Sequence, residues 1–352
     1  MNGQRIKVCM IGAGGFGHRH AKAWYENPLV DFVAVCGRTK ERTQKRADEF
    51  GVRAYTDIEE MLQREKPDLV DVVTQEQDQY DAIMKVLRTD CAKAVFTEKP
   101  LGVNVQQAYE LVKTAKEKNV DFGVDFNRRF SMPYQYVNRW IKERRIGDLS
   151  YITLKFSHDP YDPPVETDPY RWFFNVYPHA YDMLSYFSGP VKTISAFFAK
   201  PKNHFYYKRF TINFLFKNDC VANLIGGGEG KWRHQSEYLE AGGTKGQAVA
   251  VNVTEQAMLR LHDEELEQVW RPAIAEGPGL DFFEVSVTNH LNCIADRLHQ
   301  GETLPVNAGY ALYAQILMQA TKKSHEAGGI PVDIDQYLDE MPYKDIRELL
   351  PM

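Results

Sequence analysis

A candidate binding motif lies near the start of the chain. Its glycines stand in the order Gly-x-Gly-x-x-Gly, at Gly12, Gly14 and Gly17. This spacing is typical of a loop that binds the phosphates of a dinucleotide. Gly12 permits a tight turn, Gly14 lets the backbone approach a pyrophosphate, and Gly17 lets a helix pack against the sheet. The first amides of that helix, including those of Gly15 and Phe16, would face the phosphates at the positive end of its dipole. An apolar run precedes the glycines and a helical pattern follows, so we expect a cofactor loop rather than an ordinary turn.

The residues after the second expected strand indicate which dinucleotide binds. An acid that holds the adenosine ribose hydroxyls usually stands about twenty positions past the glycines, and Gly37 occupies that place. Arg38, Thr39 and Lys40 follow with two cations and a hydroxyl. A guanidinium can bind a 2′-phosphate through paired hydrogen bonds, whereas an acid would repel it. The pattern favours NADP and leaves NAD possible; the alternative is that these cations only solvate the start of the next helix.

Strands and helices alternate over residues 1–126. Apolar or β-branched runs predict strands at 31–36, 69–74, 92–96 and 121–124, and helical patterns lie between them. This alternation predicts right-handed crossovers in a doubly wound parallel sheet, with a cofactor along the carboxyl ends of the strands. The candidate cofactor residues that follow these ends are Thr74, Gln75, Glu98 and Lys99.

The second part of the chain, residues 127–352, has a different pattern. Apolar runs follow one another from 192 to 253 without helices between them, which predicts an antiparallel sheet. Helices are expected before these runs, including one over 173–187, and two more after them. The predicted fold class is therefore α/β: a Rossmann dinucleotide-binding domain over 1–126, followed by an α+β domain over 127–352 with a large, mostly antiparallel open sheet.

Composition excludes several classes of protein. The 352 residues are 43% hydrophobic and 26% charged, as expected for a soluble globular protein of two domains. A net charge of -5 without a basic stripe argues against a nucleic-acid partner. No apolar run approaches the ~18 residues of a membrane span. The five scattered cysteines suggest neither a disulfide framework nor a metal site, so we expect free thiols in a reducing compartment, the cytoplasm.

The segment Thr97 to Gly102 resembles the Glu-Lys-Pro signature of the glucose-fructose oxidoreductase / inositol dehydrogenase family (Gfo/Idh/MocA). Three later segments extend the resemblance in the same order along the chain. They are Asn127 to Phe130, similar to the domain-junction motif; Tyr170 to Trp172, similar to the Trp-Arg region; and Asn175 through His179 to Asp182, similar to the Asp-x-x-x-His-x-x-Asp helix.

This resemblance implies oxidation of a sugar, sugar derivative or cyclic polyol, or reduction of its ketone, with NAD or NADP. It implies that Lys99 bonds the reacting oxygen, that His179 is the general acid/base, and that Arg128 and Arg171 lie at the cofactor. Asn175 replaces the family aspartate and would orient the His179 imidazole from one turn earlier on the same helix. The open sheet of such proteins often forms an oligomer interface, so a homodimer or homotetramer is expected.

Two departures from the family pattern keep other functions open. Asn175 carries no charge, and the segment Thr74 to Tyr80 lacks the usual proline and histidine. One alternative is a redox-silent sensor or accessory protein that binds cofactor. Another is a glycoside-cleaving enzyme or lyase that oxidises its substrate transiently with bound cofactor. The presence of both Lys99 and His179 favours a dehydrogenase.

Overall fold

The computed structural model describes residues 5–157, 168–228, 236–272 and 282–351, which form two compact units. Unit 1 contains Met1–Asn127, Ser286–Gln315 and Glu348–Pro351. Unit 2 contains Arg128–Val285 and Ile316–Arg347. The sequence assigned all of 127–352 to the second domain, whereas Ser286–Gln315 packs in unit 1.

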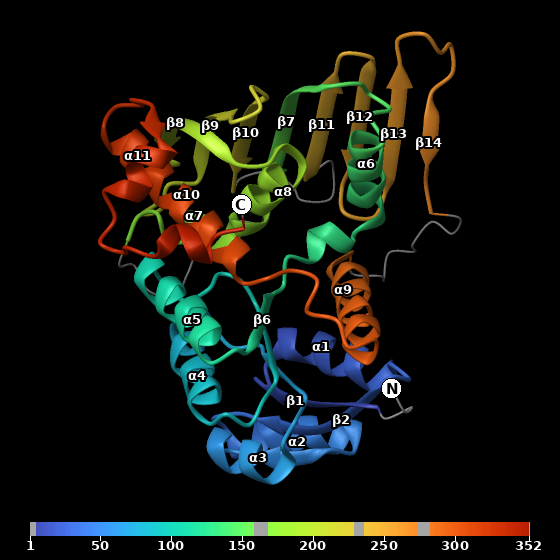
Figure 1. Cartoon of the computed structure of the whole chain (residues 1–352), viewed down its shortest axis with the longest axis vertical. Coiled ribbons are helices and arrows are strands. Elements are labelled where there is room, and N and C mark those ends of the chain that lie inside the picture. Colours follow the sequence, from blue (N-terminus) through green and yellow to red (C-terminus); the bar gives the residue numbers. More distant parts are fainter. Residues whose placement is uncertain (1–4, 158–167, 229–235, 273–281, 352) are drawn as a thin grey trace. The chain divides into compact units, whose positions relative to one another are not determined.

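Unit 1 is built on a six-stranded sheet in the order β3-β2-β1-β4-β5-β6, with every pair parallel (Figure 1). The strand order reverses between β1 and β4, and in sheets of this kind ligands bind at the carboxyl ends of the strands beside such a reversal. The strands are β1 (Ile6–Ile11), β2 (Val30–Cys36), β3 (Arg53–Tyr55), β4 (Leu69–Val72), β5 (Ala94–Thr97) and β6 (Asp121–Val124). The helices between them are α1 (Gly15–Glu26), α2 (Lys40–Phe50), α3 (Ile58–Glu65), α4 (Glu76–Arg88) and α5 (Val105–Glu117). The short strand β3 was not predicted, because three residues are too few to give a pattern.

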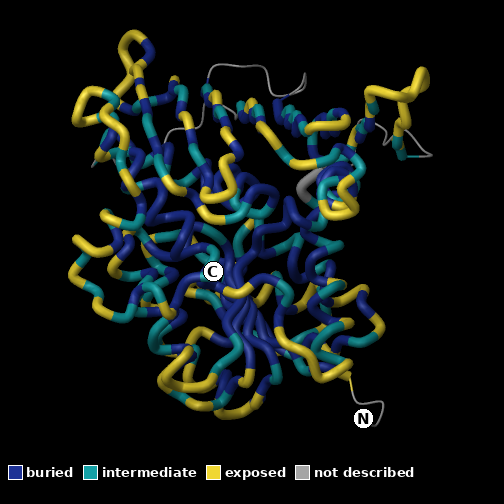
Figure 2. The backbone as a smooth tube through the Cα atoms, turned by 45° about the horizontal axis from the view of Figure 1, so that its top comes forward, coloured by how far each residue is buried: buried dark blue, intermediate teal, exposed yellow. Residues whose placement is uncertain are grey.

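The core of unit 1 explains why a late helix belongs to it. Strand residues such as Val8 and Phe96 are fully buried together with Trp24 of α1. Val287 and Leu291 of α9 (Phe282–His299) are buried in the same cluster. Figure 2 shows the buried backbone gathered along the strands of this unit. Apolar burial stabilises by roughly 25 cal/mol per Å², so this face of α9 fixes the helix to the Rossmann sheet.

Unit 2 contains a nine-stranded sheet in the order β14-β13-β12-β11-β7-β10-β9-β8-β15, in which β7 and β10 are parallel and the other neighbours antiparallel. The mostly antiparallel sheet that the sequence predicted is therefore present. Its strands are β7 (Leu149–Ser157), β8 (Val191–Ala199), β9 (Arg209–Phe216), β10 (Val221–Gly227), β11 (Glu237–Gly243), β12 (Gly246–Val251), β13 (Gln256–Leu261), β14 (Gln268–Trp270) and β15 (Val332–Asp333). The helical elements of unit 2 are η1 (Asn127–Phe130, whose first residue falls in unit 1), α6 (Met132–Lys142), α7 (Arg171–Val176), α8 (Pro178–Ser188), α10 (Gly309–Glu326, which begins in unit 1) and α11 (Ile334–Asp339).

The helix expected over 173–187 is in fact two helices, α7 and α8. Tyr177 ends the first and caps the second, with φ -97° and ψ 5°. Pro178 is the first residue of α8, and a proline cannot donate the backbone hydrogen bond that a continuous helix needs there. The prediction of one continuous helix was wrong at this point.

The two faces of the large sheet differ in burial. One face is covered, and aromatic residues including Phe173, Tyr177 and Phe210 pack closely there. On the other face Phe197 is 53% exposed and Ile225 50% exposed. Phe197 of β8 and Ile225 of β10 both pair with Thr211 of β9. The three residues therefore lie in one row across the sheet. Within the described ranges, no helix is long and apolar enough to cross a bilayer.

Candidate functional site

The glycine loop joins β1 to α1 at the strand order reversal. Gly12 has φ +126°, a conformation that favours glycine, and a Cβ there would lie 2.0 Å from the Val73 carbonyl oxygen. A Cβ at Gly17 would lie 2.3 Å from the Gly12 carbonyl oxygen, so only glycine lets the helix approach this closely. By contrast, a Cβ at Gly14 or Gly15 would meet no protein atom within 4 Å. The loop therefore leaves open space beside the backbone where a pyrophosphate would bind.

Thr74 follows Val73 after the end of β4, the strand next to β1 in the sheet. Its hydroxyl is buried and has no hydrogen-bond partner among the residues the structure describes. A buried hydroxyl without a partner costs about 1 to 3 kcal/mol. A polar group of a bound dinucleotide would satisfy it, so this part of the site fits such a cofactor. Gln75, the next residue, is the exposed N-cap of α4, and its side-chain oxygen accepts from Gln77 at 2.6 Å.

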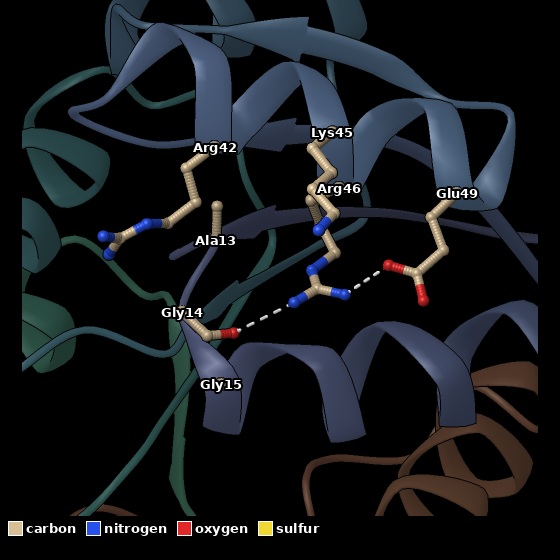
Figure 3. Close-up of a pocket in the computed structure, with 7 residues that line it drawn as sticks. All are labelled: Ala13, Gly14, Gly15, Arg42, Lys45, Arg46 and Glu49. Atoms are coloured by element: carbon tan, nitrogen blue, oxygen red, sulfur yellow. Dashed lines mark hydrogen bonds and ion pairs between the residues drawn. The ribbon is translucent and has the colours of Figure 1, made fainter.

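A recess of about 230 Å³ lies between the glycine loop and α2 (Figure 3). Three cations of α2 and one acid line it together with the loop; the lining residues are Ala13, Gly14, Gly15, Arg42, Lys45, Arg46 and Glu49. Arg46 pairs with Glu49, and its Nη2 donates to the Gly14 carbonyl oxygen at 3.3 Å. Arg42 and Lys45 add further positive charge, which suits a phosphate. Arg42 was not predicted as a site residue; the available signal was its place in the same basic stretch as Arg38 and Lys40.

The segment that was expected to select the cofactor leads into this recess. A Cβ at Gly37 would lie 2.5 Å from Thr43 Oγ1 and 3.3 Å from Ala13 Cβ, so an aspartate at position 37 requires the surroundings to shift. Arg38 is exposed and forms an ion pair with Asp78 at 3.0 Å. Thr39 caps α2 through its backbone, and its side chain makes no capping hydrogen bond.

The Glu-Lys-Pro segment lies at the carboxyl end of β5. Glu98 is buried, whereas Lys99 is partly exposed and precedes a cis Pro100. Gln79 of α4 holds the turn: its Nε2 donates to Thr97 Oγ1 at 3.0 Å and to the Glu98 carbonyl oxygen, and its Oε1 accepts from the Gly102 amide at 2.7 Å. Sequence reasoning noted only that Thr74 to Tyr80 departs from the family pattern, and it missed this supporting role of Gln79.

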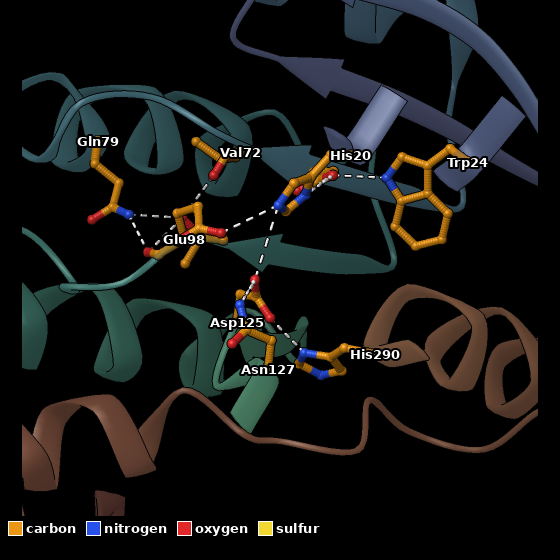
Figure 4. A network of polar contacts seen from close by, with 10 residues as sticks. His20, Trp24, Val72, Gln79, Glu98, Asp125, Asn127 and His290 are labelled. Atoms are coloured by element: carbon orange, nitrogen blue, oxygen red, sulfur yellow. Dashed lines mark hydrogen bonds and ion pairs between the residues drawn. The ribbon is translucent and has the colours of Figure 1, made fainter. Parts of the chain in front are cut away.

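The Glu98 carboxylate points into a buried polar network in unit 1 (Figure 4). His20 Nε2 lies 3.2 Å from Glu98 Oε1 and 3.9 Å from Asp125 Oδ2. Among the described residues, these three have candidate ligand atoms close enough to one another to hold a metal ion. His20 Nε2 contacts both carboxylates, so the three residues also form a polar cluster of their own. None of the histidine contacts was predicted, because they depend on tertiary packing.

His179 belongs to unit 2, in the first turn of α8, and is 5% exposed. Three residues later Asp182 accepts two hydrogen bonds from Arg129, from Nε at 2.9 Å and from Nη2 at 2.6 Å. The Arg129 guanidinium lies over the Tyr186 ring at 4.6 Å. Asp182 therefore ties α8 to η1. Asn175 lies in α7 and not in α8, so the expected spacing of one turn along a single helix does not apply.

The two arginines expected at the cofactor have different environments, both in unit 2. Arg128 is 1% exposed, and its Nε and Nη2 both donate to Glu237 Oε1, at 3.2 and 2.7 Å. Tyr134 donates to the other oxygen of Glu237 at 2.8 Å. This buried group gives Arg128 a structural task that the motif comparison had not indicated. Arg171, by contrast, is partly exposed at the start of α7.

The parallel sheet, the strand order and the glycine loop together define unit 1 as a dinucleotide-binding Rossmann domain. Residues 6–126 match the family described as "Oxidoreductase family, NAD-binding Rossmann fold" (Gfo/Idh/MocA). Over residues 6–126 the chain is thus similar to the Gfo/Idh/MocA oxidoreductases.

Curated relatives share part of the chain. It is 29% identical over 161 residues to inositol 2-dehydrogenase of Rhizobium meliloti (strain 1021), a match that covers 46% of this chain and 48% of that protein. It is 28% identical over 155 residues to D-glucoside 3-dehydrogenase of Escherichia coli (strain K12), covering 44% and 43%. The chain thus spans about half the length of the curated relatives it matches.

Solved structures share the fold over nearly the whole chain. An oxidoreductase from Agrobacterium radiobacter, in complex with NAD+, L-tartaric acid and magnesium, gives a TM-score of 0.82 at 19% identity and covers 95% of this chain and 99% of that one. Scyllo-inositol dehydrogenase from Lactobacillus casei, with bound NAD(H) and scyllo-inositol, gives 0.76 at 18% identity and covers 94% and 100%. At this identity the likeness shows the fold alone, a Rossmann domain followed by a mostly antiparallel sheet.

Proposed function

We propose that the protein is a dehydrogenase or reductase that transfers a hydride between a nicotinamide cofactor and a CH–OH carbon of a sugar, sugar derivative or cyclic polyol. The observation that carries the proposal is Lys99 in a buried, hydrogen-bonded turn at the carboxyl end of β5, in the same Rossmann domain as an open glycine loop. The names of the curated relatives, an inositol and a glucoside dehydrogenase, support the substrate class.

In this proposal the cofactor supplies the hydride acceptor, and the chain supplies the groups that bind it and handle the proton. The loop amides and the Thr74 hydroxyl bind the cofactor. Lys99 donates to the substrate oxygen and stabilises the charge that develops on it. His179 takes the hydroxyl proton, and Asn175 stands where the family motif has an aspartate.

The experiment that tests the function is a panel of inositols, glucosides and free sugars incubated with NADP+ or NAD+. Formation of reduced nicotinamide, read by its absorbance, supports a dehydrogenase. Binding of cofactor without turnover of any panel member would favour the sensor or accessory protein. Cleavage of a glycoside without net reduction would favour the lyase or glycoside-cleaving enzyme.

We also propose that NADP is preferred, and that Arg42 acts with Arg38 at its 2′-phosphate. The family match and the structural neighbours support NAD binding in general, and the preference rests on this chain's own residues. Gly37 has little room for a ribose-binding acid, and cations of α2 line the recess beside the glycine loop.

Replacement of Arg42 by alanine is expected to weaken NADP+ binding about tenfold or more, because a charge-assisted hydrogen bond contributes about 1.5 to 3 kcal/mol. NAD+ affinity should change little, since NAD+ has no 2′-phosphate. Fluorescence titration with both cofactors measures the effect. Lys93→Ala is the matched control: it removes one cation of unit 1 that is 85% exposed and precedes β5. Equal losses for NADP+ and NAD+, or an NAD+ preference in the parent, would contradict the assignment.

The exposed face of the large sheet is the surface we propose for self-association, as a homodimer or homotetramer. Phe197 and Ile225 on this face are half exposed, and Val221 on the same strand as Ile225 is 51% exposed. An apolar row on a sheet is typical of a protein–protein contact. Ile225→Asp should therefore lower the assembled fraction in sedimentation velocity, because the carboxylate would be buried in the interface. An unchanged distribution, or a parent that sediments as a monomer, would refute it; Leu266→Asp, 82% exposed and off the sheet, is the control.

A further inference from the structure

Three carboxylates and two histidines form a buried cluster in unit 1 (Figure 4). They are His20 of α1, Asp71 of β4, Glu98 after β5, Asp125 after β6 and His290 of α9. Four of them are 0% exposed, and Glu98 is 8% exposed. Glu98 is therefore the member through which the cluster can exchange a proton with the surroundings.

The histidines link the acids in pairs. His20 Nδ1 lies 2.9 Å from Asp71 Oδ2, and His20 Nε2 lies 3.2 Å from Glu98 Oε1. His290 Nδ1 lies 2.6 Å from Asp125 Oδ1. A carboxylate oxygen of Glu98 and one of Asp125 lie within 4.8 Å of each other. Two ionised carboxylates this close together repel each other, which favours a proton on one of them.

The charges in the cluster also indicate that one carboxyl group carries a proton. Both ring nitrogens of His20 face carboxylates, which favours the imidazolium. Glu98 and Asp125 both lie near His20 Nε2, so ionising both carboxyl groups would place two negative charges against that one N–H and leave excess negative charge there. Burying a charge without compensation costs several kcal/mol. One proton on the Glu98 and Asp125 pair removes this excess.

The surroundings place that proton on Glu98. Burial, together with the neighbouring Asp125 carboxylate, raises the pKa of Glu98 to about 7. Burial by itself would raise the pKa of Asp125 as well, but His290 and His20 outweigh it and lower that pKa. Against burial, Asp71 and Glu98 raise the pKa of His20 well above its ordinary value.

The remaining neighbours of Glu98 complete its environment. Gln79 of α4 binds the Glu98 backbone and carries no charge, and Lys99 is the adjacent charged residue in the chain. Asn127 donates to Asp125 Oδ2 at 3.1 Å, which further stabilises the ionised aspartate. The proton that exchanges near neutral pH thus lies on Glu98, the residue of the Glu-Lys-Pro segment that precedes Lys99.

We propose that Glu98 is a proton-exchanging group linked to the charge of the nicotinamide ring, with His20 and Asp125 as its positioning residues. The inference rests on the proposed function, because it takes Glu98 to line the cofactor site at the end of β5. Oxidised nicotinamide carries a positive charge that the reduced ring lacks, so the oxidised cofactor favours the ionised carboxylate and the reduced cofactor its protonated form. Binding of the oxidised form then releases a proton to solvent.

The test compares the dissociation constants of NADP+ and NADPH between about pH 6 and about pH 8.5, on either side of the Glu98 pKa. The ratio of the two constants is the useful quantity, because both forms carry the same 2′-phosphate and its own titration cancels. As the pH rises through about 7, the affinity for NADP+ should increase relative to the affinity for NADPH. For one fully linked proton, the ratio of the two dissociation constants should change by at most about tenfold per pH unit below pH 7. A flat ratio in the parent protein overturns the proposal without any variant.

Variants assign the proton to the cluster. In Glu98→Gln the ratio of the two dissociation constants should no longer depend on pH. In the parent protein, binding of NADP+ should remove the infrared band of a protonated carboxyl group. His20→Gln removes a cation that favours the ionised carboxylate, so the midpoint should move to higher pH. Glu65→Gln is the matched control: Glu65 is also buried in unit 1, but it pairs with Arg53 and its pKa is lowered. A pH-dependent ratio that persists in Glu98→Gln would overturn the assignment.

Two results separate this inference from the proposed function. Failure of the parent to bind either cofactor would refute the function and the inference together. Turnover with a pH-independent ratio would refute the inference and leave the function standing. One divalent ion per purified chain, lost in His20→Gln, would show that His20, Glu98 and Asp125 hold a metal instead of the proposed proton.

Discussion

Replacing Lys99 by methionine is expected to lower turnover about a hundredfold or more, while cofactor affinity stays within a few fold of the parent. Methionine keeps much of the length of the side chain and removes the ammonium. A donor aimed at the reacting oxygen acts mainly in the transition state, where the oxygen gains negative charge. Turnover of the best panel substrate with NADP+ and fluorescence titration of NADP+ measure the two effects separately.

Lys93→Met provides the matched control for Lys99→Met. Lys93 precedes the same strand, β5, but it is 85% exposed and pairs with Asp68 at 3.0 Å. The control removes an identical charge from the same domain, so its turnover should equal that of the parent. If Lys99→Met retained near-normal turnover, the lysine would have no part in the chemistry. Any role of Glu98 and its cluster would then have to be explained without Lys99.

The parts of unit 1 that could be predicted are those that local rules determine. The positive φ of Gly12 and the close approach of Gly17 to the loop are the constraints that make glycine necessary, and both are written in the spacing of the motif. The parallel sheet followed from alternating apolar and helical segments in the same way. Lys99 became a candidate because it follows a predicted strand that would end at the crevice and because its segment resembles the family's Glu-Lys-Pro signature.

The buried cluster could not be predicted, because its contacts join distant parts of the chain. His290 and Asp125 are 165 positions apart, and His20 and Glu98 are 78 apart. A histidine in a helical pattern gives no sign of which acids it will meet, and the sequence placed His290 in the second domain whereas it packs in unit 1. By contrast, the interruption at Pro178 was visible in the sequence, and the predicted continuous helix gave it too little weight.

Asp182 shows how a motif residue can have a structural role. Together with His179 it belongs to the segment that resembles the family's active-site helix, yet it is 2% exposed and binds Arg129 through both of its oxygens. Arg129 is 7% exposed, so both partners are shielded from water. The pair joins α8 to η1 inside unit 2, and it therefore fixes the position of the helix that carries His179.

Replacing Asp182 by alanine is expected to lower the free energy of unfolding by about 3 to 5 kcal/mol, because it leaves the Arg129 cation buried without its carboxylate. A urea titration followed by tryptophan fluorescence measures this loss. Lys217→Ala is the control: its ion pair with Asp335, at 2.8 Å, is 41% and 46% exposed and should contribute at most about 1 kcal/mol.

The double variant Arg129→Met with Asp182→Leu separates the charge from the packing. It removes both charges and fills similar space with apolar atoms, so it should recover most of the stability that Asp182→Ala loses, as buried pairs replaced by apolar residues often do. Recovery of stability without recovery of turnover would show that the pair is needed to hold His179 in place. A loss in Asp182→Ala no larger than that in Lys217→Ala would mean that α8 is held by its apolar contacts, such as that of Tyr181 with Phe214, and that the ion pair is dispensable.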